Sequence, residues 1–335
     1  MVKKSPKTIR APRREQLLSY SPYIVVGLIS LVLPPFTDPY LKSMMAKILI
    51  FAIFALSLNL IFGYVGLFSL GHAAFLGVSS YTAAILIVRY GITNFWLVSP
   101  IAILTAVLFA AIFGVIALRA SGIYFLLVTL AMGQLLYSIT LKWRTMTGGS
   151  DGIAGIPYPD LGIPGLTMNA TSFYYLVLAV FIICFLLMRR VVNSPFGQAL
   201  QGIREDERRM RHLGYHTWLY KYIAFIIAGL FAGVAGVLFG SYTTIIVPDY
   251  LGVLTSTLVM LMVIIGGTGV FWGPALGAAV VVLLEHYASL YTPERWPLIL
   301  GGVFILAVML LRGGISIHLL NLWKKVRYSY GSGKD

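Results

Sequence analysis

Repeated apolar runs of about 18 to 25 residues constrain the fold of this chain more than any other feature. Each run is long enough to cross a hydrocarbon core of ~30 Å as an α-helix. The strands of a membrane barrel would instead alternate in polarity over ~10 residues. Because 59% of the 335 residues are hydrophobic and 11% are charged, we expect an all-α polytopic membrane protein.

The runs predict about ten transmembrane helices. Their expected bounds are 20–36, 44–62, 68–88, 97–118, 122–141, 173–190, 221–241, 251–267, 272–290 and 297–311. These bounds divide the chain into a basic N-terminal arm at 1–19, a transmembrane domain at 20–311 and a basic tail at 312–335. The arm carries six basic residues, and no small-residue cleavage pattern follows the first run, so we expect no secretory signal peptide.

The net charge of +14 would suggest nucleic acid as the partner of a soluble protein. In a membrane protein the same excess is typical of loops that stay in the cytoplasm. With the N-terminus inside, nineteen of the 25 Lys and Arg residues fall on the inner side and six on the outer side. We therefore predict both termini in the cytoplasm, contact with membrane lipid, and no nucleic-acid partner.

One charged interruption, Arg189 to Lys221, holds ten of the 36 charged residues. Within it, Ser194 before Pro195 predicts a helix start and Gly214 predicts a helix end. The i,i+4 spacing predicts ion pairs from Glu205 to Arg209 and from Glu207 to Arg211. The same stretch carries an apolar stripe that a short interfacial helix would bury: Phe196, Leu200, Ile203, Met210 and Leu213. A solvated helix explains the charges but not the stripe, so we expect the 193–214 segment to dock on a partner.

Two further stretches are unlike regular helices. The outer segment 142–172 is rich in Gly and Pro, and we expect a structured vestibule element at Gly148, Gly149, Ser150 and Asp151, with a plain surface loop as the alternative. Glycines also recur at close spacing in 63–77 and again in 266–277. Such paired segments are compatible with an internal duplication, as in many transporters, although close helix packing or chance would produce the same pattern.

The chain carries little that predicts chemistry of its own. Its only Gly-Lys pair, at 333–334, lacks the context of a nucleotide-binding loop, and the single cysteine, Cys184, excludes a disulfide framework. We expect no catalytic residue, no metal site and no cofactor. Intramembrane polar residues are the candidates for a translocation pathway: Asn59, Ser69, His72, Thr129, Gln134 and Glu285. Ordinary hydrogen bonding between helices is the alternative for each of them.

Several blocks of the sequence resemble the LivM-type permeases, from importers of branched-chain amino acids and related solutes. These blocks are LSLNLIFGYVGLFSLGHAAFLGVSSYTAAIL, GIYFLLVTLAMGQLLYSI, TGGSDGIAGIP, SPFGQALQGIREDERRMRHLGYHTWLYKYIAFIIAGLFAGVAGVLFG and GGTGVFWGPALGA. They occur in the order of that family and cover roughly residues 44 to 311. The spacing from Glu207 to Gly214 is seven residues, whereas the widespread Glu-Ala-Ala loop of importers has six. This segment therefore resembles the LivM-type permeases but departs from the general loop of importers.

The resemblance implies a permease subunit of an ATP-binding-cassette importer in a bacterial or archaeal inner membrane. It implies a second permease, two cytoplasmic ATPase subunits that bind ATP and Mg, and an extracytoplasmic solute-binding protein. It further implies that 193–214 is the coupling helix, with these residues facing the ATPase: Phe196, Leu200, Arg204, Glu205, Asp206, Glu207, Leu213 and Gly214.

Alternative functions stay open at this point. The same class of importer also carries urea, amides or aromatic acids. An ion-coupled secondary transporter would use Glu285 as its coupling carboxylate, and a structural membrane subunit would need no pathway residues at all.

Overall fold

Helices make up most of the computed structural model, which describes residues 37–162, 168–268, 270–291, 296–310 and 313–318. The first half contains α2 (Pro39–Asn59), the π-helical η2 (Leu60–Val65), α3 (Ala73–Ala84), the π-helical η3 (Ile85–Arg89), α4 (Phe95–Ala117), α5 (Ile123–Lys142), α6 (Arg144–Thr147), η4 (Gly149–Asp151) and β1 (Ile153–Ala154). The second half contains α7 (Ala170–Val192), α8 (Pro195–Glu205), α9 (Glu207–His212), α10 (Thr217–Thr243), β2 (Ile245–Ile246), η5 (Pro248–Leu251), α11 (Val253–Gly266), α12 (Gly273–Tyr291) and α13 (Trp296–Leu310). The predicted arm 1–19, the predicted helix 20–36 and most of the predicted tail lie outside the described residues.

Six helices of the described chain have the length and apolar character needed to cross a membrane. They are Pro39–Val65, Phe95–Ala117, Ile123–Lys142, Ala170–Val192, Thr217–Thr243 and Gly273–Leu290. Shorter apolar helices cover Ala73–Arg89 and Val253–Gly266, and α13 has 15 residues. The protein is thus an all-α polytopic membrane protein, with helices over nine of the ten predicted spans within the described residues. It does not reproduce ten full-length crossings, because several of these helices are short.

The first short helix, α3, begins inside the bundle. Its predicted span started at residue 68, but residues 66–72 are non-helical and the helix begins at Ala73. Gly71 lies directly against the backbone carbonyl of Thr129, in the middle of α5, so a side chain could not fit there. Irregular backbone at membrane depth persists only where protein or water surrounds it, and here Leu67, Ser69, Gly71 and His72 are buried while Phe68 is exposed.

The long helix α2 forms the centre of the bundle, in contact with α7, α10, α11 and α12. Every residue from Ile50 to Asn59 is buried. A helix that is hydrophobic all round is typical of a buried position, and the sequence of α2 has this character. Lipid would therefore reach α2 only near its start.

Small residues bring α10 close to its neighbours α3 and α4. Gly229 and Gly233 of α10 lie against Ala110 and Ala106 of α4. The hydroxyl of Ser79 in α3 donates to the carbonyl of Gly233 at 2.7 Å. Close approach of this kind is a common way for helices to associate in lipid, where apolar burial supplies no driving force.

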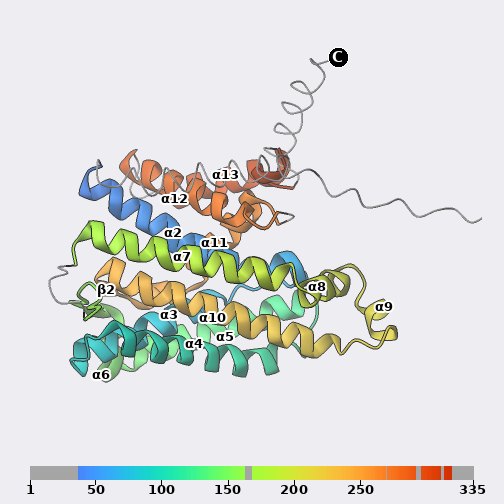
Figure 1. Cartoon of the computed structure of the whole chain (residues 1–335), viewed down its shortest axis with the longest axis horizontal. Coiled ribbons are helices and arrows are strands. Elements are labelled where there is room, and N and C mark those ends of the chain that lie inside the picture. The colour runs from blue at the N-terminus through green and yellow to red at the C-terminus, as the bar shows by residue number, and fades with distance from the viewer. Residues whose placement is uncertain (1–36, 163–167, 269, 292–295, 311–312, 319–335) are drawn as a thin grey trace, which may run out of the picture.

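Short elements lie at each end of the long axis of the bundle (Figure 1). Figure 1 shows α8 and α9 extending from one end of the helices, while α6 and β2 lie at the other end. Strand β1 pairs antiparallel with β2. Along the perimeter, α4, α5 and α7 expose large apolar side chains such as Leu104, Leu127 and Ile183, as expected of a lipid-facing surface.

Candidate functional site

Helix α8 is anchored to the bundle by its sequence. The Ser194 hydroxyl caps the helix by accepting from the Gly197 amide at 3.4 Å, and Pro195 occupies the first turn. Leu200 and Ile203 are buried, and the Phe196 ring stacks on Tyr220 of α10 with centroids 5.5 Å apart. The predicted cap and most of the predicted apolar stripe of α8 are therefore confirmed.

The 193–214 segment contains two helices rather than the single one predicted. Asp206 has φ −155° and ψ 99°, which ends α8, and its carboxylate caps α9 by accepting from the Arg209 amide at 3.0 Å. Within the described chain no ion pair joins Glu205 to Arg209, because the break at Asp206 destroys the i,i+4 geometry. Gly214 has φ +88° and follows the end of α9, as predicted.

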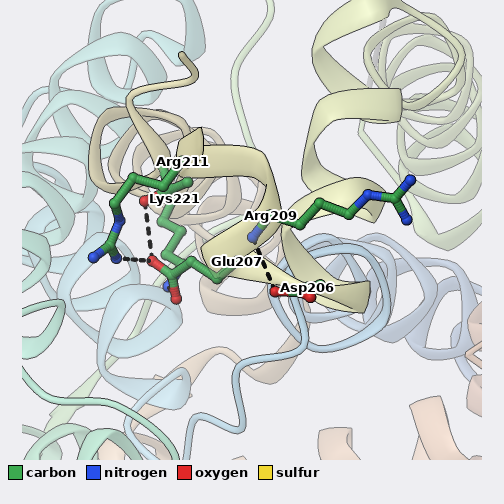
Figure 2. A network of polar contacts seen from close by, with 6 residues as sticks. Asp206, Glu207, Arg209, Arg211 and Lys221 are labelled. Atoms are coloured by element: carbon green, nitrogen blue, oxygen red, sulfur yellow. Dashed lines mark hydrogen bonds and ion pairs between the residues drawn. The ribbon is translucent and has the colours of Figure 1, made fainter. Parts of the chain in front are cut away.

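Glu207 is the centre of a polar network between α9 and α10 (Figure 2). It lies 2.5 Å from the Lys221 ammonium and 3.2 Å from the Arg211 guanidinium, and it accepts from the Thr217 hydroxyl at 3.0 Å. Partial burial favours a higher pKa for Glu207, but the charge and hydrogen bond of Lys221, together with the other donors, outweigh burial. The pKa of Glu207 therefore lies below its ordinary value. The predicted Glu207–Arg211 pair is confirmed, and Lys221 ties the same carboxylate to α10.

The outward surface of this segment is charged, with one large apolar residue. Glu205 and Asp206 are exposed, as are Arg208 and Arg209. Leu213 is 65% exposed, although it was predicted to belong to a buried stripe, because the break at Asp206 turns α9 away from the face that α8 buries. The described part of the chain leaves most of the Leu213 side chain uncovered.

Arg204 faces its own transmembrane domain. Its guanidinium donates to the backbone carbonyl of Gly63 in η2. At Gly66 the backbone has φ +82°, and a Cβ there would meet the Arg204 side chain at 2.9 Å. Arg204 thus joins α8 directly to the end of the central helix.

A buried polar cluster surrounds the non-helical residues 66–72. The Ser57 hydroxyl lies 2.8 Å from Nε2 of His72, and the Thr129 hydroxyl accepts from the Leu70 amide at 3.3 Å. The Ser256 hydroxyl accepts from the Ala73 amide at 3.0 Å. These side chains satisfy backbone groups where α3 begins inside the bundle.

Four of the predicted pathway residues lie in or beside this cluster. Asn59, Ser69, His72 and Thr129 are all buried. Oδ1 of Asn59, the Ser69 hydroxyl and Nδ1 of His72 have no hydrogen-bond partner among the described residues. None of the four lines either of the two cavities described below, and the Asn59 side chain lies against Gly63.

The other two predicted pathway residues line one cavity. This cavity has a volume of about 570 Å³ and lies between α2, α5, α10, η5, α11 and α12. Gln134 and Glu285 contribute to its wall, together with Lys47, Tyr137 and Asp249. The predicted set therefore consists of four buried residues and two that line this cavity.

Lys47 and Glu285 form an ion pair at the edge of this cavity. Lys47 Nζ lies 3.0 Å from Glu285 Oε2, and the two side chains are 24% and 22% exposed. Lys47 stands eight residues after the start of α2, which corresponds to about 12 Å along the helix. A second, smaller cavity of about 130 Å³ shares both residues and is also lined by Tyr40 and His286, whose Oη and Nδ1 are 2.7 Å apart.

The predicted vestibule element is an ordered turn. Gly148 and Gly149 have φ +79° and +64°, and η4 includes Ser150 and Asp151, both of which are exposed. Gly152 follows, and its α-carbon packs against the backbone of β2. As predicted, the segment 142–172 is not one regular helix.

Lys47 and Asp249 are cavity residues that sequence reasoning did not select. Lys47 stands within the predicted span 44–62 and Glu285 within the predicted span 272–290. Opposite charges in two apolar spans can neutralise one another when the helices pack together, and this signal could have indicated the pair. Asp249 follows no comparable pattern, because η5 is too short to predict.

Comparison with known proteins gives one family match. The family described as "Branched-chain amino acid transport system / permease component" matches residues 40–311. No solved structure matches the chain significantly.

Individual relatives have related names. The high-affinity branched-chain amino acid transport system permease protein LivM of Escherichia coli strain K12 is 31% identical over 285 residues, which cover 78% of this chain and 66% of that protein. A probable branched-chain amino acid transport permease protein LivM of Methanocaldococcus jannaschii is 25% identical, over 72% of this chain and 79% of the relative. The high-affinity branched-chain amino acid transport system permease protein LivH of Salmonella typhimurium is 23% identical, over 78% of this chain and 88% of the relative. The chain thus spans slightly less than two thirds of the Escherichia coli LivM.

Proposed function

Since the chain belongs to the family of branched-chain amino acid transport permease components, we propose that it is one permease subunit of an ATP-binding-cassette importer. With a second permease it would form the pathway for branched-chain amino acids. The two relatives named LivM and LivH support a pair of different permeases. Two ATPase subunits that bind ATP and Mg, and an extracytoplasmic solute-binding protein, complete the proposed complex.

The observation that carries this proposal is the outward surface of α8 and α9. It projects from one end of the bundle (Figure 1), and it presents exposed charges around Leu213, which is 65% exposed. An apolar residue within a polar rim has the arrangement found in protein interfaces. We assign this surface to the ATPase subunits, with Glu205, Asp206, Leu213 and Gly214 in contact with the partner.

The inner residues of the same segment have a different proposed role. Arg204 joins α8 to η2, and Glu207 joins α9 to α10 through Lys221. Phe196 and Leu200 pack α8 onto the bundle. A movement of the ATPase would reach the central helix through these contacts, so we place them in transmission rather than in docking.

The orientation follows from the charges. Arg119, Arg189 and Arg190 belong to loops or helix ends at the α8–α9 end of the bundle, and four more arginines lie within 193–214. Because Lys and Arg concentrate on the cytoplasmic side, we propose that this end is cytoplasmic. The turn at Gly148–Asp151 would then face outward, where a solute-binding protein docks.

The proposal is tested by Leu213→Ser in the full-length chain, expressed with its partner subunits. Leu213 is 65% exposed, so the variant should fold as the wild type does. Loss of one apolar anchor costs about 1–2 kcal/mol, which corresponds to roughly five- to thirtyfold weaker recovery of ATPase subunits. ATP-dependent leucine uptake in proteoliposomes should fall accordingly.

The matched control is Ile123→Ser. Ile123 is 69% exposed and starts α5 at the same end of the bundle, but it lies outside 193–214. Equal recovery of ATPase subunits with both variants would contradict the assignment of this surface. Uptake that needs no ATP and is abolished by an ionophore would instead support an ion-coupled transporter. Glu285, the coupling carboxylate of that alternative, is paired with Lys47.

A further inference from the structure

We propose that the 570 Å³ cavity is a binding site for a zwitterionic amino acid with an apolar side chain. Lys47 would bind the solute carboxylate, and Glu285 and Asp249 would bind its ammonium group. The inference rests on the proposed function, because it gives the solute a place within this subunit. It also gives the permease a selectivity of its own, separate from that of a solute-binding protein.

Three charged side chains line the cavity, Lys47, Glu285 and Asp249. The Lys47–Glu285 pair is partly buried, at 3.0 Å, and Asp249 accepts from the Tyr137 hydroxyl at 3.4 Å. Asp249 lines the same cavity as this pair. Ionisable groups within membrane spans are costly and commonly mark a solute or ion pathway.

The remaining wall is largely apolar. Its apolar members include Phe51, Phe239, Val253, Leu254 and Leu258, and Gln134, Thr243 and Thr255 add polar groups. The volume lies within the ~300–1,000 Å³ of typical small-molecule sites. A site with a charged part and an apolar part fits a solute with a charged head and a hydrocarbon body.

The ion pair favours a zwitterion over a singly charged solute. A zwitterion can enter between Lys47 and Glu285 and replace their contact with two charge-assisted hydrogen bonds. An amine without a carboxylate would leave Lys47 without a partner, and a carboxylate without an amine would leave Glu285 without one. An unpaired buried charge is strongly unfavourable, so both analogues should bind poorly.

Binding of radiolabelled leucine to the purified transporter complex tests this site. Leucine should bind the wild type, and a hundredfold excess of leucinamide or 4-methylpentanoate should displace it poorly. Lys47→Met combined with Glu285→Gln removes the pair without leaving a charge alone, so this double variant should assemble normally. It should bind leucine about ten- to hundredfold more weakly, because two hydrogen bonds to charged groups are lost.

Lys42→Met is the matched control. Lys42 lies on the same helix and donates to the Thr171 hydroxyl at 3.0 Å, but it lines neither described cavity. Leucine should bind this variant as it binds the wild type. The single variant Lys47→Met should also make leucinamide a relatively better competitor, a change in preference that a purely structural ion pair would not cause.

The same preparations, reconstituted with the binding protein and ATP, separate the two proposals. ATP-driven leucine uptake by the wild type, with unchanged leucine binding in the double variant, would overturn the cavity site and leave the importer standing. Leucine binding that depends on Lys47 and Glu285, without any ATP-driven uptake by the wild type, would support the site and overturn the importer.

Discussion

At the residue scale, Gly66 and Arg204 hold α8 against the central helix. Gly66 adopts a left-handed backbone, φ +82°, that side chains other than glycine rarely tolerate. Its missing Cβ also leaves room for the Arg204 side chain as it reaches the Gly63 carbonyl. A methyl group at position 66 would therefore destabilise the protein in two ways, through backbone strain and through a clash with the Arg204 side chain.

Gly66→Ala should destabilise the protein more than Gly91→Ala does. Gly91 has a similar backbone, φ +69°, but nothing lies within 4 Å of its absent Cβ. Both variants carry the backbone strain of about 1–3 kcal/mol, and only Gly66→Ala adds the contact with Arg204. Thermal unfolding in detergent should show a lower Tm for Gly66→Ala, by a few degrees relative to Gly91→Ala. Equal Tm values would mean that Arg204 moves aside without cost.

Single residues also show what the sequence could predict at this scale. Ser194 and Gly214 were identified correctly, because capping and helix ends depend on local backbone chemistry. The exposure of Leu213 was not predicted correctly, because it depends on the direction of α9 after the break at Asp206. Lys47 was overlooked as a site residue, since its partner Glu285 is 238 positions away and only packing brings them together.

At the scale of elements, the break at Asp206 turns one amphipathic stretch into two helices with separate roles. Helix α8 packs on the bundle, and α9 carries the outward surface. With six residues, α9 is too short to be stable alone, so its cap and its network around Glu207 hold it in place. The stability of α9 therefore depends on the Asp206 cap and on the polar contacts of Glu207.

Asp206→Ala should loosen α9 and leave the bundle intact. Loss of an N-cap costs about 1 kcal/mol, which is large for a helix of this length. Backbone amide exchange in 207–213 should become severalfold faster, with little change in α10. Asp206→Asn is the control, because an asparagine oxygen can still cap the helix. Fast exchange in Asp206→Asn as well would show that charge, rather than capping, stabilises α9.

Elements also show the limits of reading spans from apolar runs. The spans of α4, α5, α7 and α10 were close to those predicted, because each is a single long apolar helix. The predicted start of α3 was wrong by five residues. Residues 66–72 are non-helical, with Gly71 packed against the Thr129 carbonyl and the Leu70 amide bonded to the Thr129 hydroxyl. The polarity of a residue indicates whether it is buried, but it does not indicate whether its backbone is helical.

At the scale of the whole molecule, the bundle depends on close contact between α10 and its neighbours. Gly229 faces Ala110, and a Cβ there would already crowd the alanine. Helices in lipid associate largely through such packing. A bulky side chain at this position would therefore separate α10 from α4 along much of their length.

Gly229→Leu should prevent correct assembly of the bundle. Overpacking of a tight contact typically costs 1–3 kcal/mol or more, and this contact lies between two central elements. The yield of monodisperse protein in detergent gel filtration should fall severalfold. Gly301→Leu is the control, because nothing lies within 4 Å of the absent Cβ of Gly301 and its yield should match the wild type. A normal yield of Gly229→Leu would show that α10 and α4 can shift apart without penalty.

The pairing of Lys47 with Glu285 has an electrical consequence. A single charge that crosses a membrane potential of 100 mV exchanges about 2.3 kcal/mol with the field. The two side chains carry opposite charges 3.0 Å apart. A movement that shifts them together therefore exchanges almost no free energy with the membrane field. A zwitterion bound between them keeps that balance. The conformational cycle at this pair would therefore proceed at the same rate in an energised cell and in one whose membrane potential has collapsed.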